Sequence, residues 1–230
     1  MWTEHLQPLA GAGFRALALD LPGFGEAPLN ANEDAPWNDV LATMDALEIE
    51  QATLVGNSFG GGVAQRVAVL APERISSLAL ISSTATGIDP SPALQAAGEA
   101  EEAALDEGDI EAAVGAVVEA WMLADAPREL RERVGRMQRR AFELQMSVDW
   151  APEGFDPLKH DLDPLSIVDA PALIVVGEHD IEDFHAAADA LERALPNAQK
   201  TVLPDAGHLA PLEQPGAFRE LLLALIAARR

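Results

Sequence analysis

Residues 52–64 read Ala-Thr-Leu-Val-Gly-Asn-Ser-Phe-Gly-Gly-Gly-Val-Ala, and this stretch decides the fold. Its first part, through Val55, is a short apolar run typical of a buried strand, and a helical pattern follows the glycines. Between the two lies Gly-x-Ser-x-Gly, the pattern of a nucleophile elbow, in which a tight turn presents Ser58 at the end of the strand. We expect Gly56 and Gly60 to be needed because strand and helix approach closely there. The alternative interpretation is a glycine-rich connection with an incidental serine.

Further apolar runs alternate with helical patterns on both sides of the elbow. Strands that alternate with helices form a parallel sheet covered on both faces, so the sequence predicts an α/β fold with a mostly parallel sheet. Ligands of such sheets bind beyond the carboxyl ends of the strands. The other predicted strands are 14–19, 77–81, 172–176 and 199–203.

The alternation stops between about residues 88 and 165. This segment is rich in Ala and Glu, and its apolar residues recur at helical spacing. We therefore expect a helical insertion that acts as a cap. The predicted organisation is a first part of the core at 1–87, the cap at 88–165 and a second part of the core at 166–230.

A serine hydroxyl is a weak nucleophile at neutral pH and needs a base that an acid orients. Two later strand ends offer such groups: Asp180 follows the run 172–176, and His208 follows the run 199–203. The chain order Ser, Asp, His is the one expected for this arrangement. Asp183 is the competing acid, and His208 has the alternative role of capping a turn.

The remaining histidines have less specific interpretations. His179 adjoins Asp180, but neighbouring residues at a strand end point in opposite directions, so we expect it to face away. We interpret His5, His160 and His185 as surface or packing residues. A metal site formed by His179, Asp180, Asp183 and His185 is the alternative, but these residues have no recognised ligand spacing, and we expect no metal.

Composition excludes several classes of partner. The 230 residues carry a formal net charge of −23, which repels phosphate backbones and anionic membrane surfaces, so we expect no nucleic acid and no membrane as partner. No long uncharged apolar run or signal peptide is evident. The sequence contains no cysteine, and a cytoplasmic location is the default expectation.

Four stretches together resemble the α/β-hydrolase fold superfamily, in the branch with a helical cap. The resemblance implies a cofactor-free serine hydrolase with Ser58 as nucleophile, Asp180 as acid and His208 as base. It also implies that the Phe59 backbone N–H contributes to an oxyanion hole. The stretches are Asp20-Leu-Pro-Gly-Phe-Gly25, Gly56-Asn-Ser-Phe-Gly-Gly61, Gly177-Glu-His-Asp180 and Gly207-His-Leu-Ala-Pro-Leu-Glu-Gln-Pro215.

The front of the chain departs from this family. Members normally begin with about three strands, the third ending in a His-Gly loop that donates the second oxyanion-hole N–H, whereas this chain opens at once with a predicted helix from Trp2. The absent third strand would lie between 14–19 and the elbow strand, leaving two rows of unpaired backbone groups. Three outcomes follow: the sequence is a truncated form of a longer protein, the strand 14–19 pairs directly with the elbow strand, or a partner chain fills the gap in a homo-oligomer.

The resemblance favours a small-molecule substrate, namely a carboxylic ester or lactone. A carbon–carbon hydrolase of aromatic ring-cleavage products is the alternative, although that branch usually has Trp after the catalytic His, where Leu209 stands here. A cofactor-free haloperoxidase activity, or an inactive or binding homologue, are further alternatives. Trp121, Met137, Trp150 and Leu209 are candidates to line the substrate pocket, although cap residues of this kind can also simply pack the helices together.

Overall fold

The computed structural model describes residues 1–29, 35–146, 148 and 155–227. Its strands form one sheet in the order β1-β2-β3-β4, and each neighbouring pair is parallel. The carboxyl ends are aligned, since Asn57 lies opposite Ile81 and Gly177 opposite Leu203. This sheet confirms the predicted α/β fold. The strands are β1 (Ala52–Asn57), β2 (Ile75–Ile81), β3 (Ala172–Gly177) and β4 (Ala198–Leu203).

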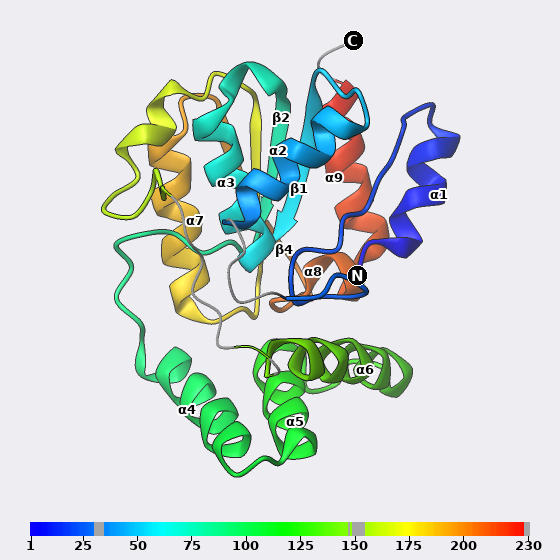
Figure 1. Ribbon diagram of the computed structural model, residues 1–230, viewed down its shortest axis with the longest axis vertical. Coiled ribbons are helices and arrows are strands. Elements are labelled where there is room, and N and C mark those ends of the chain that lie inside the picture. The colour runs from blue at the N-terminus through cyan, green and yellow to red at the C-terminus, as the bar shows by residue number, and fades with distance from the viewer. Residues whose placement is uncertain (30–34, 147, 149–154, 228–230) are drawn as a thin grey trace.

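Helices cover both faces of the sheet (Figure 1). On one face, side chains such as Leu80 and Ile174 pack against α3 and α7, and on the other, Ile81 and Val175 pack against Phe218 of α9. Every residue of β3 is buried, which explains its uninterrupted apolar sequence. The covering helices are α1 (Thr3–Gly11), α2 (Pro36–Ala46), α3 (Phe59–Leu70), α7 (Glu182–Ala194) and α9 (Pro215–Ala227).

Three further helices form a separate layer beyond the carboxyl ends of the strands (Figure 1). We call α4 (Pro92–Asp106), α5 (Ile110–Trp121) and α6 (Arg128–Gln145) the helical layer. Ser91 and Asp109 cap the amino ends of α4 and α5, where their side-chain oxygens accept backbone N–H groups. The layer has its own apolar cluster, centred on Ala113, Val114, Val117, Val118, Val134 and Phe142.

Three short helices lie in the connections between the longer elements. Of the helices in the described ranges, even the longest, α6 with 18 residues, is highly charged, and none has the length and apolar character that a membrane crossing requires. The short elements are η1 (Pro72–Arg74), η2 (Asp163–Ile167) and α8 (Ala210–Glu213).

The predicted strand at 14–19 is wrong. These residues have no strand structure, and β1 is the edge of the described sheet, so direct pairing with the elbow strand, one of the three alternative outcomes, is wrong as well. A strand exists only where a neighbour completes its ladder, and 14–19 runs past β1 without one. Leu17 and Leu19, which a central strand would bury, are 50% and 41% exposed. The other two outcomes, a longer protein or a partner chain, stay predictions.

A groove of about 1600 Å³ separates this segment from β1. Residues 14–21 form one wall, and the whole of β1 forms another. At the carboxyl end of β1 the groove reaches Ser58 and His208. The predicted nucleophile and base therefore border the same open space.

Candidate active site

Ser58 occupies the sharp turn between β1 and α3. Its φ of 52° and ψ of −119° lie in a region that a residue with a side chain rarely adopts, and such strain is typical of functional sites. The Ser58 N–H donates to the carbonyl of Ile81 at 2.9 Å, which anchors the turn to β2. Ser58 is half-buried and directly precedes the amino end of α3, where negative charge is favoured.

The glycines of the elbow have unequal roles. A Cβ on Gly56 would lie 2.2 Å from the Gly60 carbonyl oxygen, so a side chain is excluded there. A Cβ on Gly60 would meet no atom within 4 Å, and the expectation that Gly60 also needs to be glycine is wrong. Gly61 is the second crowded position, because its Cβ would lie 2.2 Å from Ser83 Oγ. Gly56 is therefore needed because the Gly60 backbone lies against it, and Gly61 is needed because Ser83 lies against it.

His208 and Asp180 meet beneath the helical layer. His208 Nδ1 lies 3.1 Å and 3.2 Å from the two carboxylate oxygens of Asp180. The His208 side chain is 5% exposed and that of Asp180 is 0% exposed. Asp180 Oδ1 also accepts the Ile181 N–H at 2.9 Å. When Nδ1 donates to this carboxylate, the neutral imidazole has its lone pair on Nε2, as a general base requires.

Asn57 connects the serine turn to the histidine loop. Its Nδ2 donates to the carbonyl of Ile81 at 3.1 Å and to that of His208 at 3.2 Å. Asn57 is 8% exposed, so water competes little for these bonds. Among the described residues, no hydrogen bond joins the Ser58 hydroxyl to the His208 ring. The structure thus brings Ser58, His208 and Asp180 to one place, and their chemical roles stay predictions.

Two aromatic rings enclose the imidazole of His208. The Phe184 ring centroid lies 4.2 Å away and the Trp121 centroid 4.6 Å away. Phe184 comes from α7, just after the Asp180 loop, and Trp121 is the last residue of α5 in the helical layer. The rings shield the His208–Asp180 pair from water. Sequence reasoning missed Phe184 and Asn57; the position of Phe184 four residues after Asp180 is the one local signal that could have suggested it.

Asp183, the competing acid, is bound elsewhere. Its carboxylate accepts the Ser91 N–H at 2.7 Å and the Ser91 hydroxyl at 2.5 Å. Burial alone would raise the pKa of Asp183, but these hydrogen bonds outweigh it and hold the pKa below its ordinary value. Asp183 therefore fixes the segment that enters α4, and Asp180 is the carboxylate that reaches His208.

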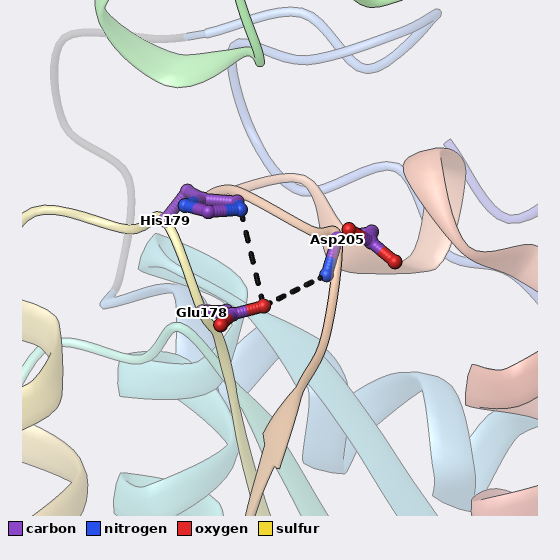
Figure 2. Close-up of side chains that lie close together, drawn as sticks. All are labelled: Glu178, His179 and Asp205. Atoms are coloured by element: carbon purple, nitrogen blue, oxygen red, sulfur yellow. Dashed lines mark hydrogen bonds and ion pairs between the residues drawn. The ribbon is translucent and has the colours of Figure 1, made fainter.

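His179 faces away from His208, as expected. Figure 2 shows its ring beside Glu178 and Asp205, with His179 Nε2 3.9 Å from Glu178 Oε2. Of the described residues, these three form the group that could share a metal ion, since one ligand atom from each lies within 4.8 Å of the others. All three are exposed, and Glu178 already accepts the Asp205 N–H at 3.2 Å. The alternative cluster around His185 does not form, because Asp180 and Asp183 take separate partners.

The remaining predicted residues line the groove or begin α3. Phe59 is the first residue of α3, so its N–H has no acceptor within the helix and is available to an oxyanion. Its ring stacks on Phe24 at 5.8 Å. Trp121, Met137 and Leu209 all border the groove, whereas Trp150 lies outside the described residues.

Comparison with known proteins gives matches along the whole chain. A family model described as "Alpha/beta hydrolase family" matches residues 1–221. The acetyltransferase component of the acetoin cleaving system of Pseudomonas putida is 34% identical over 234 residues, which cover 95% of this chain but 58% of that protein. This chain therefore spans little more than half the length of that relative.

Two further matches are enzymes with named substrates. The 2-hydroxymuconate semialdehyde hydrolase of Pseudomonas sp. (strain CF600) is 49% identical over 73 residues, or 30% of this chain and 26% of that protein. A solved structure of an N-acyl homoserine lactone degrading enzyme is 29% identical with a TM-score of 0.68, covering 89% of this chain and 80% of that chain.

Proposed function

This chain belongs to the alpha/beta hydrolase family, and we propose that it is a serine hydrolase that cleaves small carboxylic esters or lactones. The observation that carries the proposal is the buried pair of His208 and Asp180, whose loop is hydrogen-bonded to the residue before Ser58. The similarity to an N-acyl homoserine lactone degrading enzyme supports this substrate class.

The proposed reaction has two halves. Ser58 Oγ attacks the substrate carbonyl carbon while His208 Nε2 takes the hydroxyl proton, and Asp180 stabilises the imidazolium that forms. The negative oxygen of the tetrahedral intermediate is stabilised by the Phe59 N–H at the start of α3. The intermediate collapses when His208 protonates the leaving alcohol. Water, deprotonated by His208, then attacks the acyl-enzyme, and His208 returns this proton to Ser58 Oγ as the acid leaves, which restores both side chains.

This reaction requires the Ser58 hydroxyl to reach the His208 ring. Catalytic hydrogen bonds are often long in the absence of substrate and tighten when it binds. Both residues border the same groove, and the Asn57 hydrogen bond limits how far their loops can separate. We expect substrate binding to complete the contact.

We propose that the helical layer acts as a cap over this site. Trp121 lies directly on the His208 ring, and Met137 and Leu209 border the groove beside it. These side chains are apolar, so they favour an apolar acyl or alcohol group on the substrate.

A carbon–carbon hydrolase is the second candidate. The observation that favours it is the 49% identity, over 73 residues, to a 2-hydroxymuconate semialdehyde hydrolase. Leu209, which follows His208, is the residue that departs from the expected pattern of that class. The same three side chains would serve both reactions, so substrate tests must separate them.

A fluorophosphonate probe tests the proposal directly. We expect the wild-type protein to form an adduct at Ser58, Ser58→Ala to form none, and Ser166→Ala, an exposed serine away from the groove, to label as the wild type does. Absence of an adduct on folded wild-type protein would contradict a serine hydrolase. Rates on nitrophenyl esters, homoserine lactones and ring-cleavage dienoates then define the class, and turnover of the dienoates alone would favour the second candidate.

A further inference from the structure

We propose that Glu213 is a positioning residue that couples the helical layer to His208. The inference rests on the proposed function for its catalytic meaning, but its structural content can be measured without turnover. Glu213 is the last residue of α8, the short helix that follows the His208 loop. Among the described residues, the hydrogen bonds of the Glu213 carboxylate go to backbone N–H groups and not to Ser58 or the His208 ring, so it acts through the backbone that it binds.

The Glu213 carboxylate joins two segments that are distant in the sequence. Its Oε2 accepts the Gly207 N–H at 2.7 Å, and its Oε1 accepts the Leu123 N–H at 2.9 Å. Gly207 directly precedes His208, whereas Leu123 lies in the loop between α5 and α6. One side chain therefore binds the histidine loop and the helical layer at the same time.

These two hydrogen bonds require a carboxylate. Each oxygen accepts one N–H, and hydrogen bonds to an ionised acceptor are stronger than those between neutral groups. A glutamine of the same shape has one acceptor oxygen, and its NH₂ group would face a second N–H donor. The isosteric change to Gln therefore breaks one of the two links and leaves the volume of the side chain unchanged.

The bridge sets the position of the imidazole relative to Trp121. Leu123 follows Trp121 by two residues, and the Trp121 ring lies 4.6 Å from that of His208. Glu213 is thus linked to the imidazole in two ways. It binds Gly207, the neighbour of His208, and it binds Leu123, which holds Trp121 against the His208 ring. A shift of the helical layer relative to the core would move Trp121 against the His208 ring. Glu213 opposes this shift because it holds the Leu123 and Gly207 backbones together.

A matched control for the helical layer exists at Arg131. Its Nη1 donates to the Leu123 carbonyl at 3.0 Å, so Arg131 binds the same residue through the next peptide group and has no hydrogen bond to Gly207. Arg131→Gln loosens the α5–α6 loop and also removes the ion pair between Arg131 and Glu119 of α5, so its effects stay within the helical layer. Glu213→Gln affects both that loop and the residue before His208, so comparison of the two variants isolates the link to the base.

The experiment combines amide hydrogen exchange with ester kinetics. In Glu213→Gln we expect faster exchange at Gly207 and Leu123 and a drop in kcat on the order of tenfold, because misplacing a reacting group by about 1 Å can cost up to about 10²-fold. In Arg131→Gln we expect faster exchange at Leu123, a higher KM and an unchanged kcat. Should Glu213→Gln not fold, Glu213→Asp, whose shorter side chain cannot reach both amides, is expected to show the same drop.

Two results would overturn the inference. One is unchanged exchange at Gly207 in Glu213→Gln, which would show that the carboxylate does not hold this backbone. The other is a kinetic change identical to that of Arg131→Gln, confined to KM, which would show a role in the helical layer only. Failure of the proposed function gives a different result: Ser58→Ala would keep the wild-type rate while the exchange data stay as expected.

Discussion

The side-chain amide of Asn57 donates a hydrogen bond to the carbonyl oxygen of His208 at 3.2 Å, across 151 positions of sequence. The same nitrogen donates to the Ile81 carbonyl at 3.1 Å, so the elbow, β2 and the histidine loop share one donor group. Because Asn57 is buried, loss of this group takes from the His208 carbonyl oxygen a donor that water does not easily replace, whereas the Ile81 carbonyl keeps the Ser58 N–H. The relative position of Ser58 and His208 therefore depends on an amide that takes no part in the proposed chemistry.

Asn57→Ala is expected to lower both stability and catalytic rate. Loss of a buried hydrogen-bonding group costs about 1–3 kcal/mol of unfolding free energy, and the histidine loop should shift away from Ser58. Urea denaturation and kcat on a nitrophenyl ester measure the two effects. The control is Asn197→Ala, which removes a similar hydrogen bond to the Asp169 carbonyl on the exposed surface and should leave kcat unchanged. Equal kcat values for both variants would contradict the role of Asn57.

Gly56→Ala and Gly60→Ala are expected to have opposite effects. The new Cβ of Gly56→Ala would lie 2.2 Å from the Gly60 carbonyl oxygen, a backbone atom with little freedom to move, so we expect a loss near the upper end of the range of about 1–3 kcal/mol for overpacking. The new Cβ of Gly60→Ala meets nothing within 4 Å, and alanine favours the helix by about 0.5–1 kcal/mol. Thermal unfolding of both variants is the measurement. A Gly56→Ala protein as stable as the wild type would contradict the inference that the elbow has no room for a side chain at position 56.

The parts of the fold that local sequence determines are the parts that could be predicted. The strand before Ser58 and the helix after it follow from an apolar run, a glycine-rich turn and helical spacing within 20 residues. Asp180 and His208 could be located because each follows a predicted strand, and the strands end at the same edge of a parallel sheet. The family resemblance added the expected roles of Ser58, Asp180 and His208 and of the Phe59 N–H.

The predictions that failed depend on what lies next to a segment in space. The pattern at 14–19 has the apolar residues of a strand, but no neighbouring strand completes its ladder, and Leu17 and Leu19 are exposed. Likewise the need for glycine at position 60 could not be assessed, because it depends on the direction of a single Cα–H bond. The contacts of Asn57 and Glu213 join residues separated by up to 151 positions, and no local pattern predicts them.

Trp121 is expected to support catalysis by packing against the His208 ring and excluding water, without taking part in proton transfer. Trp121→Ala removes the ring from His208, admits water to the His208–Asp180 pair and should lower kcat on the order of tenfold. Trp121→Phe keeps an aromatic face over the imidazole and should retain most of the wild-type rate. Steady-state kinetics on esters of increasing chain length measure both variants. Similar rates for Ala and Phe would show that the ring is dispensable.

The hydrogen bonds between Asp183 and Ser91 should make stability depend on pH in acid. The pKa of Asp183 is lowered in the folded protein, so its contribution is fully present above the unfolded pKa of about 3.9 and is lost as the pH falls through the lower native pKa. We expect wild type to be more stable than Asp183→Asn at about pH 7 and the difference to shrink below about pH 4. Thermal unfolding across this range is the measurement. Asp89→Asn, which removes an exposed carboxylate from the same segment, is the charge control and should follow the wild-type curve. A difference between wild type and Asp183→Asn that stays constant with pH would mean that the ionised carboxylate is not what holds Ser91 to α7.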